Sequence, residues 1–358
     1  MFEQIPLILL LLIFLTGPAY CRNRHVISFR WPNFYPESFT WDPKADHFVL
    51  GSLRHRQLIS VSDAGVVSAL LSDESIPSNS SFLGISLDPR LHRLLAVVHR
   101  RSPPFSALAA YHLPTFRQLF LAPLDDFLPS PAVANDVAAD YSGNAYVTDS
   151  ANDVIYKVTE QGEATILSRS HAFKPDAVDP SGSVSHHNCG LNGVVYNPKG
   201  YLLVTQSNTG KLFKVNTDDG TTRRVILNKE LTAADGIAAR KDGVVLVVSR
   251  DKLYFIKSDD SWGEGVVFDE TALDKDRHAS SVSVGAEDRV YVLYGHVDEG
   301  NMGNSERDEF SIVEVKSEVE GKEENVWIFV LIGFGLAYFM YWRLQMRRLV
   351  QNMNKKTN

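Results

Sequence analysis

The sequence of 358 residues contains only two cysteines, Cys21 and Cys189. Disulfide-dense scaffolds are therefore excluded, because they rely on several cysteine pairs in much shorter chains. The chain also lacks an excess of base, with 36 Lys and Arg against 43 Asp and Glu. Nucleic-acid binding depends on clustered positive charge, so no nucleic-acid partner is expected.

The body of the chain also lacks the 3.6-residue apolar spacing of amphipathic helices, which excludes helical and leucine-rich repeats. Instead, one pattern recurs six times between residues 37 and 315, at intervals of roughly 43 to 57 residues. Each copy has a polar or small opening residue, a short apolar run, a turn and a β-rich run. The copies begin at Glu37, Leu83, Asn135, Asn192, Asp235 and Ser281.

The internal structure of each copy predicts strands joined by hairpins. Segments such as DYSG, NPKG and RKDG are rich in residues that tolerate positive φ or form Asx turns. The runs that follow are dense in Val, Leu, Tyr and Thr, which favour strands. About four short strands per 40–50 residues is the period of a propeller. We therefore predict an all-β fold, a six-bladed β-propeller over residues 22–315, with the strand from His25 closing the ring.

Residues 1–21 have the features of a signal peptide. An apolar run from Ile5 to Leu15 is followed by small and helix-breaking residues. The segment before it lacks Lys and Arg, so an uncleaved anchor is the alternative. Cleavage near residue 21 would leave Cys189 without an intrachain partner.

The C-terminal end carries the second apolar run. We predict an acidic stalk at 316–325, a transmembrane helix at 326–342 and a basic cytosolic tail at 343–358. The alternative is a buried core helix. The positive-inside rule orients a single-pass type I protein with the propeller in the lumen or outside the cell. The predicted location is thus a secretory-pathway membrane of the endoplasmic reticulum, vacuole or cell surface. The sequon at Asn79 is compatible with that side and with glycosylation.

The opening residues of four copies predict a metal site. Equivalent positions of a propeller converge on its axis, so Glu37, Asn135, Asn192 and Asp235 are expected to meet there. Converging carboxylates repel each other unless a cation lies between them. Two carboxylates with two amide oxygens suit Ca²⁺, whereas Mg²⁺ prefers strict octahedral geometry and Zn²⁺ prefers His or Cys. Asn and Asp also open hairpins, so each residue alone has a structural explanation.

These residues resemble the calcium-dependent phosphotriesterase superfamily, which includes senescence marker protein, gluconolactonase, luciferin-regenerating enzyme and strictosidine-synthase-like proteins. The segment from Glu37 to Trp41 resembles the Glu-x-x-x-Trp opening of the family. Asn135-Asp136, Asn192-Gly193 and Asp235-Gly236 resemble its later ligand positions. The stretch NAYVTDSANDVIYKV also resembles NHL repeats.

The resemblance implies hydrolysis of a lactone, an ester or a phosphotriester, with the metal polarising the scissile oxygen. Asp235 and His278 are the predicted catalytic residues, the histidine as proton carrier. Asp136, His296 and the pair His186-His187 are further candidates, although a surface or packing role is favoured for any single histidine.

Two function classes fit this sequence. One is a hydrolase acting on a small molecule, and an apolar substrate is favoured because the residues before Asn135 contain no Arg to bind a sugar acid. The other is a non-catalytic lumenal binding or scaffold propeller of NHL type with a structural metal, in which the insert at 167–191 plugs the channel. The state of the channel mouth separates the two classes.

Overall fold

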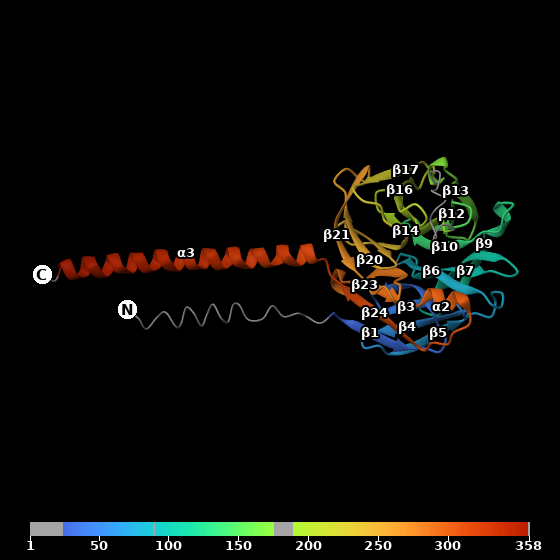
Figure 1. Ribbon diagram of the computed structural model, residues 1–358, viewed down its shortest axis with the longest axis horizontal. Helices are drawn as coiled ribbons and strands as arrows, with labels where there is room; N and C mark the ends of the chain where they lie inside the picture. Colours follow the sequence, from blue (N-terminus) through green and yellow to red (C-terminus); the bar gives the residue numbers. More distant parts are fainter. Residues whose placement is uncertain (1–23, 89, 175–188, 357–358) are drawn as a thin grey trace.

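The computed structural model describes residues 24–88, 90–174 and 189–356. The predicted signal peptide at 1–21 lies outside the described residues. Within them the strands form six four-stranded antiparallel blades around an axis (Figure 1). The first strand of each blade contacts the first strand of the next, and the sixth contacts the first. The predicted all-β, six-bladed propeller is confirmed.

The blades follow chain order. Blade one contains β2 (Pro36–Asp42), β3 (His47–Ser52), β4 (Gln57–Ser62) and β5 (Val67–Ser72). Blade two contains β6 (Ser81–Asp88), β7 (Arg93–Arg100), β8 (Phe105–His112) and β9 (Arg117–Pro123). Blade three contains β10 (Ala134–Ala139), β11 (Ala145–Asp149), β12 (Val154–Val158) and β13 (Ala164–Ser168).

The remaining blades complete the ring. Blade four contains β14 (Leu191–Asn197), β15 (Tyr201–Gln206), β16 (Lys211–Asn216) and β17 (Thr222–Leu227). Blade five contains β18 (Ala234–Ala239), β19 (Val245–Ser249), β20 (Lys252–Lys257) and β21 (Glu264–Ala272). Blade six contains β22 (Ser281–Val284), β23 (Val290–Tyr294), β24 (Glu309–Val315) and, from the N-terminal end, β1 (Val26–Arg30).

The ring is closed by pairing of β1 with β24. The two strands are antiparallel, with Val26 opposite Val313 and Arg30 opposite Glu309. Alternate residues of β1 are buried, so Ile27 and Phe29 enter the core while Val26 faces solvent. The closing role predicted for the strand from His25 is confirmed. Closure also removes the two exposed sheet edges that an open ring would leave.

The hairpin turns between the first two strands of blades one to four are Asx turns. In blades one to three the carboxylates of Asp42, Asp88 and Asp140 each accept a hydrogen bond from the backbone N–H two residues further on. Asn197 accepts the same bond in blade four. The recurring Asp or Asn therefore satisfies backbone donors that the tight turn leaves free.

The hydrophobic core lies between neighbouring blades. Between blades one and six, for example, the ring of Phe48 packs edge-on against Tyr291, at 5.0 Å between ring centroids, and contacts Phe39 at 5.3 Å. Blades four and five are also joined by a short parallel pairing of β17 with β21. The blades thus form one continuous body in which each core depends on two sheets.

Short helices occupy the loops. They are η1 (Asp125–Phe127), η2 (His171–Phe173), η4 (Ala286–Asp288) and α2 (Val297–Met302). Glu287 lies in η4 at the turn between β22 and β23, as expected. The insert expected at 167–191 contains η2, but His186 and His187 lie outside the described residues, so its predicted role as a plug stays a prediction.

The last element is α3 (Glu318–Lys356), which extends away from the propeller (Figure 1). It includes the segment 326–342, predicted to be a transmembrane helix. In the part of the chain that the structure describes, no helix is long and apolar enough to cross a membrane, so this prediction is corrected. A span needs roughly 20 apolar residues, and this run ends at Arg343, with Arg347 and Arg348 close behind.

The start of α3 is fixed to blade five. The Ser317 hydroxyl donates to Asp269 at 2.6 Å, and it accepts the backbone N–H of Glu320, as a helix N-cap does. The guanidinium of Arg240 donates two bonds of 2.8 Å to the Glu320 carboxylate. The first turn of the helix therefore begins at a defined place on the propeller.

We expect Ile27→Ala to destabilise the protein by about 2–5 kcal/mol, because it leaves a cavity in the closing blade. Val26→Ala, on the exposed face of the same strand, should cost less than about 0.5 kcal/mol. Urea unfolding of both variants measures the difference. Equal losses would show that β1 does not close the ring in solution.

Candidate metal and active site

The inner strands share one irregularity. In blades one to five the register between the first two strands shifts at the same point, between Pro36 and Phe39 in blade one and between Ala134 and Val137 in blade three. Such a bulge sets two residues opposite one and re-aims their side chains. The bulged residues are 37–38, 83–84, 135–136, 192–193 and 235–236. These are the opening residues of the sequence repeat.

Glu37, Asn135, Asn192 and Asp235, here called the oxygen quartet, line two cavities on the axis. One cavity, of about 490 Å³, also contains His278 and is called the His278 cavity. The other, of about 280 Å³, contains Asp136 and is called the Asp136 cavity. Because the same four side chains line both, they lie where the two cavities meet. The structure therefore brings the four predicted ligands together, whereas metal binding itself stays a prediction.

Glycines in the bulges allow the inner strands to approach each other. A Cβ on Gly193 would lie 2.4 Å from the carbonyl oxygen of Asp235, and one on Gly84 would lie 2.4 Å from Oδ1 of Asp136. Both distances are too short for any side chain. The glycine that follows Asn192 in the sequence thus has a packing role that brings blades four and five close at the axis.

Threonines of the second strands hold the quartet's backbone. The hydroxyl of Thr148 donates to the carbonyl oxygen of Asn192 at 2.6 Å, and Thr205 donates to that of Asp235 at 3.1 Å. Each bond crosses from one blade to the next. These hydroxyls therefore fix the backbone of two quartet residues relative to the preceding blades.

The quartet contains buried oxygen atoms without hydrogen-bond donors. Oε2 of Glu37, Oδ1 of Asn135 and the nearby Oγ of Ser280 have no partner within the described chain. Nδ2 of Asn192 does have one, because it donates to Ser207 at 3.0 Å. Buried polar atoms are almost always paired. The unpaired acceptors at the axis are the arrangement expected around a cation.

The pKa values of the carboxyl groups at the axis also favour a cation site. Burial, and then the charges of Asp235 and Asp136, raise the pKa of Glu37 well above its usual range. Burial raises the pKa of Asp235 to about 7, against a lowering by its hydrogen bond with Asn192. Burial also raises the pKa of Asp136 to about 7. Ionising any of these three carboxyl groups thus costs free energy in the folded protein, and a bound cation would offset that cost.

The donor set fits a hard divalent cation better than a softer one. No three His, Cys, Asp or Glu side chains gather into a metal-binding group in residues 24–88, 90–174 and 189–356. The quartet has only two residues of these types, and its amide oxygens are ligands that Ca²⁺ accepts. None of the four quartet residues is a His or Cys, the ligands that zinc favours.

The other candidate residues fall in different places. Asp136 lines only the Asp136 cavity, and its carboxylate accepts the backbone N–H groups of Val137 (2.8 Å) and Val194 (2.9 Å). His296 lines neither cavity; its Nδ1 lies 3.1 Å from Glu299. His278, in contrast, shares the His278 cavity with Asp235. The two predicted catalytic residues therefore face one space.

Sequence reasoning missed several cavity residues. Ser280 occupies the quartet level in blade six, one position before the start assigned to that repeat copy. A closer alignment of the sixth repeat copy with the other five would have placed Ser280 at its opening position. Arg250 lines the His278 cavity from the last position of the fifth repeat copy, and Asp298 lines it from a loop outside the repeat pattern, so the repeat did not single out either residue.

Comparison with known proteins shows the fold. No protein-family model matches the chain, and no curated protein matches it. Among solved structures, the Malassezia sympodialis allergen Mala s 1 aligns at a TM-score of 0.67 and 15% identity, over 82% of this chain and 96% of the allergen. A gluconolactonase from Xanthomonas campestris aligns at 0.53 and 15%, over 82% and 89%. A streptogramin B lyase aligns at 0.56 and 10%, over 82% and 99%.

These neighbours confirm, at the level of the fold, the predicted resemblance to gluconolactonase-type propellers. Identities of 10–17% carry no statement about substrate or cofactor. The chemistry of this chain therefore follows from its own residues.

We expect the metal-free protein to lose stability as the pH rises from about 4 to about 7. Unfolded carboxyls release their protons near pH 4, whereas Asp235 and Asp136 keep theirs to about pH 7 in the folded chain. The folded state binds more protons in this range, so each group contributes a downward slope of at most about 1.4 kcal/mol per pH unit.

Urea unfolding in chelator at a series of pH values tests this. Asp235→Asn should flatten the slope, because one buried carboxyl is removed. Asp251→Asn, in the same blade but lining neither axial cavity, should leave it unchanged. A stability that rises with pH over this range would contradict the predicted burial.

Proposed function

We propose that this propeller is a metal-dependent hydrolase of a small ester or lactone. The observation that carries the proposal is the set of unpaired, buried oxygens of Glu37 and Asn135 at the floor of the cavity that also holds His278. A cation site alone fits a structural role. A cation site that shares an open cavity with a proton-carrying side chain fits catalysis.

The oxygen quartet would hold the metal, for which we propose Ca²⁺. When bound, such an ion polarises a carbonyl or phosphoryl oxygen and stabilises the negative charge that develops on it. Asp235 lies where the two cavities meet and hydrogen-bonds with Asn192, so we assign it to metal binding rather than to proton transfer. The hydroxyls of Thr148 and Thr205 keep the quartet's backbone in place during the reaction.

His278 is the proposed proton carrier. Its side chain is 37% exposed and lines the cavity, so water and substrate can reach it. The imidazole accepts a proton from water as the water oxygen bonds to the substrate carbonyl carbon. As the bond from that carbon to the leaving oxygen breaks, the imidazolium returns the proton to the leaving oxygen. The products are an acid and an alcohol, joined in one molecule if the substrate is a lactone.

The cavity wall indicates the substrate class. Beside the polar floor it contains Leu53, Leu83, Val133, Ala279 and Val297. These side chains offer an apolar surface, as most small-molecule sites do. We therefore propose a substrate with an apolar part next to the scissile bond. The alternative, a binding propeller with a structural metal, predicts the same calcium stabilisation without turnover.

We expect calcium to raise the melting temperature of the wild-type protein. A ligand at a hundred times its dissociation constant stabilises the folded state by about 2.7 kcal/mol. Glu37→Gln and Asp235→Asn should abolish the shift, because each removes a charged ligand. Asp251→Asn should keep it. Equal shifts in the wild type and all three variants would contradict the assigned site.

We expect the wild type to hydrolyse members of a panel of aryl esters and lactones, and to lose this activity in chelator. His278→Gln should lower kcat by about 10²–10⁴-fold, the usual contribution of a general base. His112→Gln, at the end of β8 in blade two, is the matched control and should leave kcat unchanged. Calcium binding without turnover on any substrate would favour the binding propeller instead.

A secretory location for the propeller also stays a proposal, supported by the surface position of the sequon. Asn79 is exposed in the loop before β6, so it is accessible as a glycan acceptor. In a secretory host we expect a glycan that is removed by peptide N-glycosidase and absent in Asn79→Gln. An unmodified Asn79 in that host would argue against passage through the lumen.

A further inference from the structure

His278 is held in an unusual backbone conformation. It lies between β21 and β22 at φ +46°, in the left-handed region that residues other than glycine rarely adopt. Such strain persists only where the surroundings fix it, and it is concentrated at functional sites. The imidazole, which lines the His278 cavity, is held there by contacts with Asp298 and Arg250.

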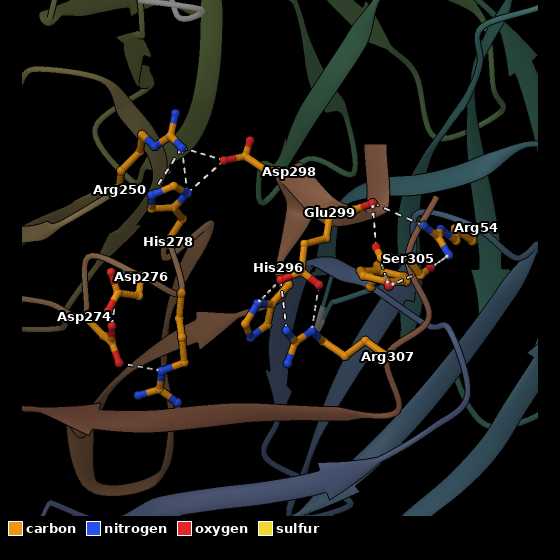
Figure 2. A network of polar contacts seen from close by, with 12 residues as sticks. Arg54, Arg250, Asp274, Asp276, His278, His296, Asp298, Glu299, Ser305 and Arg307 are labelled. Carbon is orange, nitrogen blue, oxygen red and sulfur yellow. Dashed lines mark hydrogen bonds and ion pairs between the residues drawn. The ribbon is translucent and has the colours of Figure 1, made fainter. Parts of the chain in front are cut away.

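Asp298 supplies the most direct contact. Its Oδ2 lies 2.8 Å from Nδ1 of His278, and the same oxygen accepts a hydrogen bond from Nη2 of Arg250 (Figure 2). A carboxylate only accepts hydrogen bonds, so the imidazole must carry its proton on Nδ1 to make this one. Nε2 then keeps the lone pair, and Nε2 is the atom that a base uses.

Arg250 makes the carboxylate necessary in a second way. Its Nη2 also lies 2.6 Å from Nδ1 and 3.2 Å from Nε2 of His278. A guanidinium only donates hydrogen bonds, so a bond from Arg250 to Nδ1 would need the lone pair on Nδ1, which is the tautomer opposite to the one that Asp298 favours. By accepting from Arg250, Asp298 offers the guanidinium a charged acceptor instead of the ring.

The position of Asp298 depends on the segment 296–307, here called the mouth segment. Its helix α2 has six residues, too few to be stable alone. Arg54 of blade one fixes it with three bonds to backbone carbonyls, those of Glu299 (3.1 Å), Gly300 (3.2 Å) and Ser305 (2.7 Å). The carbonyls of Glu299 and Gly300 lie in the last turn of α2, and that of Ser305 lies just after the helix, so these bonds hold its C-terminal end.

Further contacts complete the attachment of the mouth segment. Arg101 of blade two donates to Asn301 at 2.8 Å, and within the segment Arg307 donates two bonds of 2.9 Å to the Glu299 carboxylate, which hold its two ends together. In Figure 2, Glu299 lies next to Asp298, and the side chains of Arg54 and Arg307 reach Glu299 and its neighbours from the side away from Asp298. The segment is thus attached to blades one and two while Asp298 reaches the loop before blade six.

We infer that Asp298 is a positioning residue, which fixes the proton of His278 on Nδ1 and directs Nε2 to the substrate. The inference rests on the proposed hydrolytic function for its consequence, but the orientation itself is a property of the protein without substrate. The mouth segment is then part of the active site, because it carries the group that makes the histidine a base.

The orientation is tested by two-bond ¹H–¹⁵N spectra of the full chain labelled at histidine, with His278→Gln identifying the His278 signals. In the wild type we expect the pattern of a single tautomer with the proton on Nδ1. In Asp298→Asn we expect loss of that pattern, because the amide can donate to Nδ1 as well as accept. An unchanged pattern in Asp298→Asn would overturn the inference.

The functional consequence is tested by kinetics on the best substrate of the ester and lactone panel. Asp298→Asn should lower kcat about tenfold or more with little change in KM, and Asp298→Glu should restore part of the loss. Asp274→Asn is the matched control, since it breaks an Asp–Arg pair with Arg277 in the same loop without touching His278. Equal kcat values for Asp298→Asn and the wild type would overturn the inference.

The two proposals fail in different ways. If the wild type hydrolyses nothing on the panel, the proposed function fails, and the spectra still decide whether Asp298 orients His278. If the wild type is active and His278→Gln is not, but Asp298→Asn keeps both the wild-type kcat and spectrum, the hydrolase stands and the positioning role fails. Melting curves of each variant exclude unfolding as the cause.

Discussion

The whole structure depends on antiparallel pairing between two strands from opposite ends of the propeller, β1 and β24. This pairing completes blade six and lets six inner strands surround one axis. Glu37 and Asp235, nearly 200 residues apart in the chain, become neighbours only because the ring is complete. The stability of the sheet edges and the geometry of the oxygen quartet are consequences of the same closure.

At the axis, closure brings acidic groups into a buried place, where their charges are costly. The bulges of the inner strands direct these side chains inwards, and Gly84 and Gly193 let the strands approach closely enough for them to meet. Because the unpaired oxygens and raised pKa values appear together, the site is better suited to a cation than to an empty channel. The proposed metal-dependent chemistry follows from these unpaired oxygen atoms.

The fold and the quartet could be predicted from sequence because both follow the repeat. Asp42, Asp88 and Asp140 mark turns at a constant spacing, and Glu37 and Asn135 occupy equivalent positions. Asp298 could not be predicted, since it belongs to a loop present in one blade only and reaches His278 through folding alone. The transmembrane prediction failed because local hydrophobicity was judged over a run shorter than a full span.

The attachment of α3 has a mechanical consequence. The helix begins three residues after β24, the strand that holds the N-terminal closing strand. A pull along α3 would therefore load the β1–β24 hydrogen bonds in shear, were it not for Ser317 and Glu320, which transfer the force to blade five. These side-chain contacts shield the strand pair that closes the ring from tension on α3.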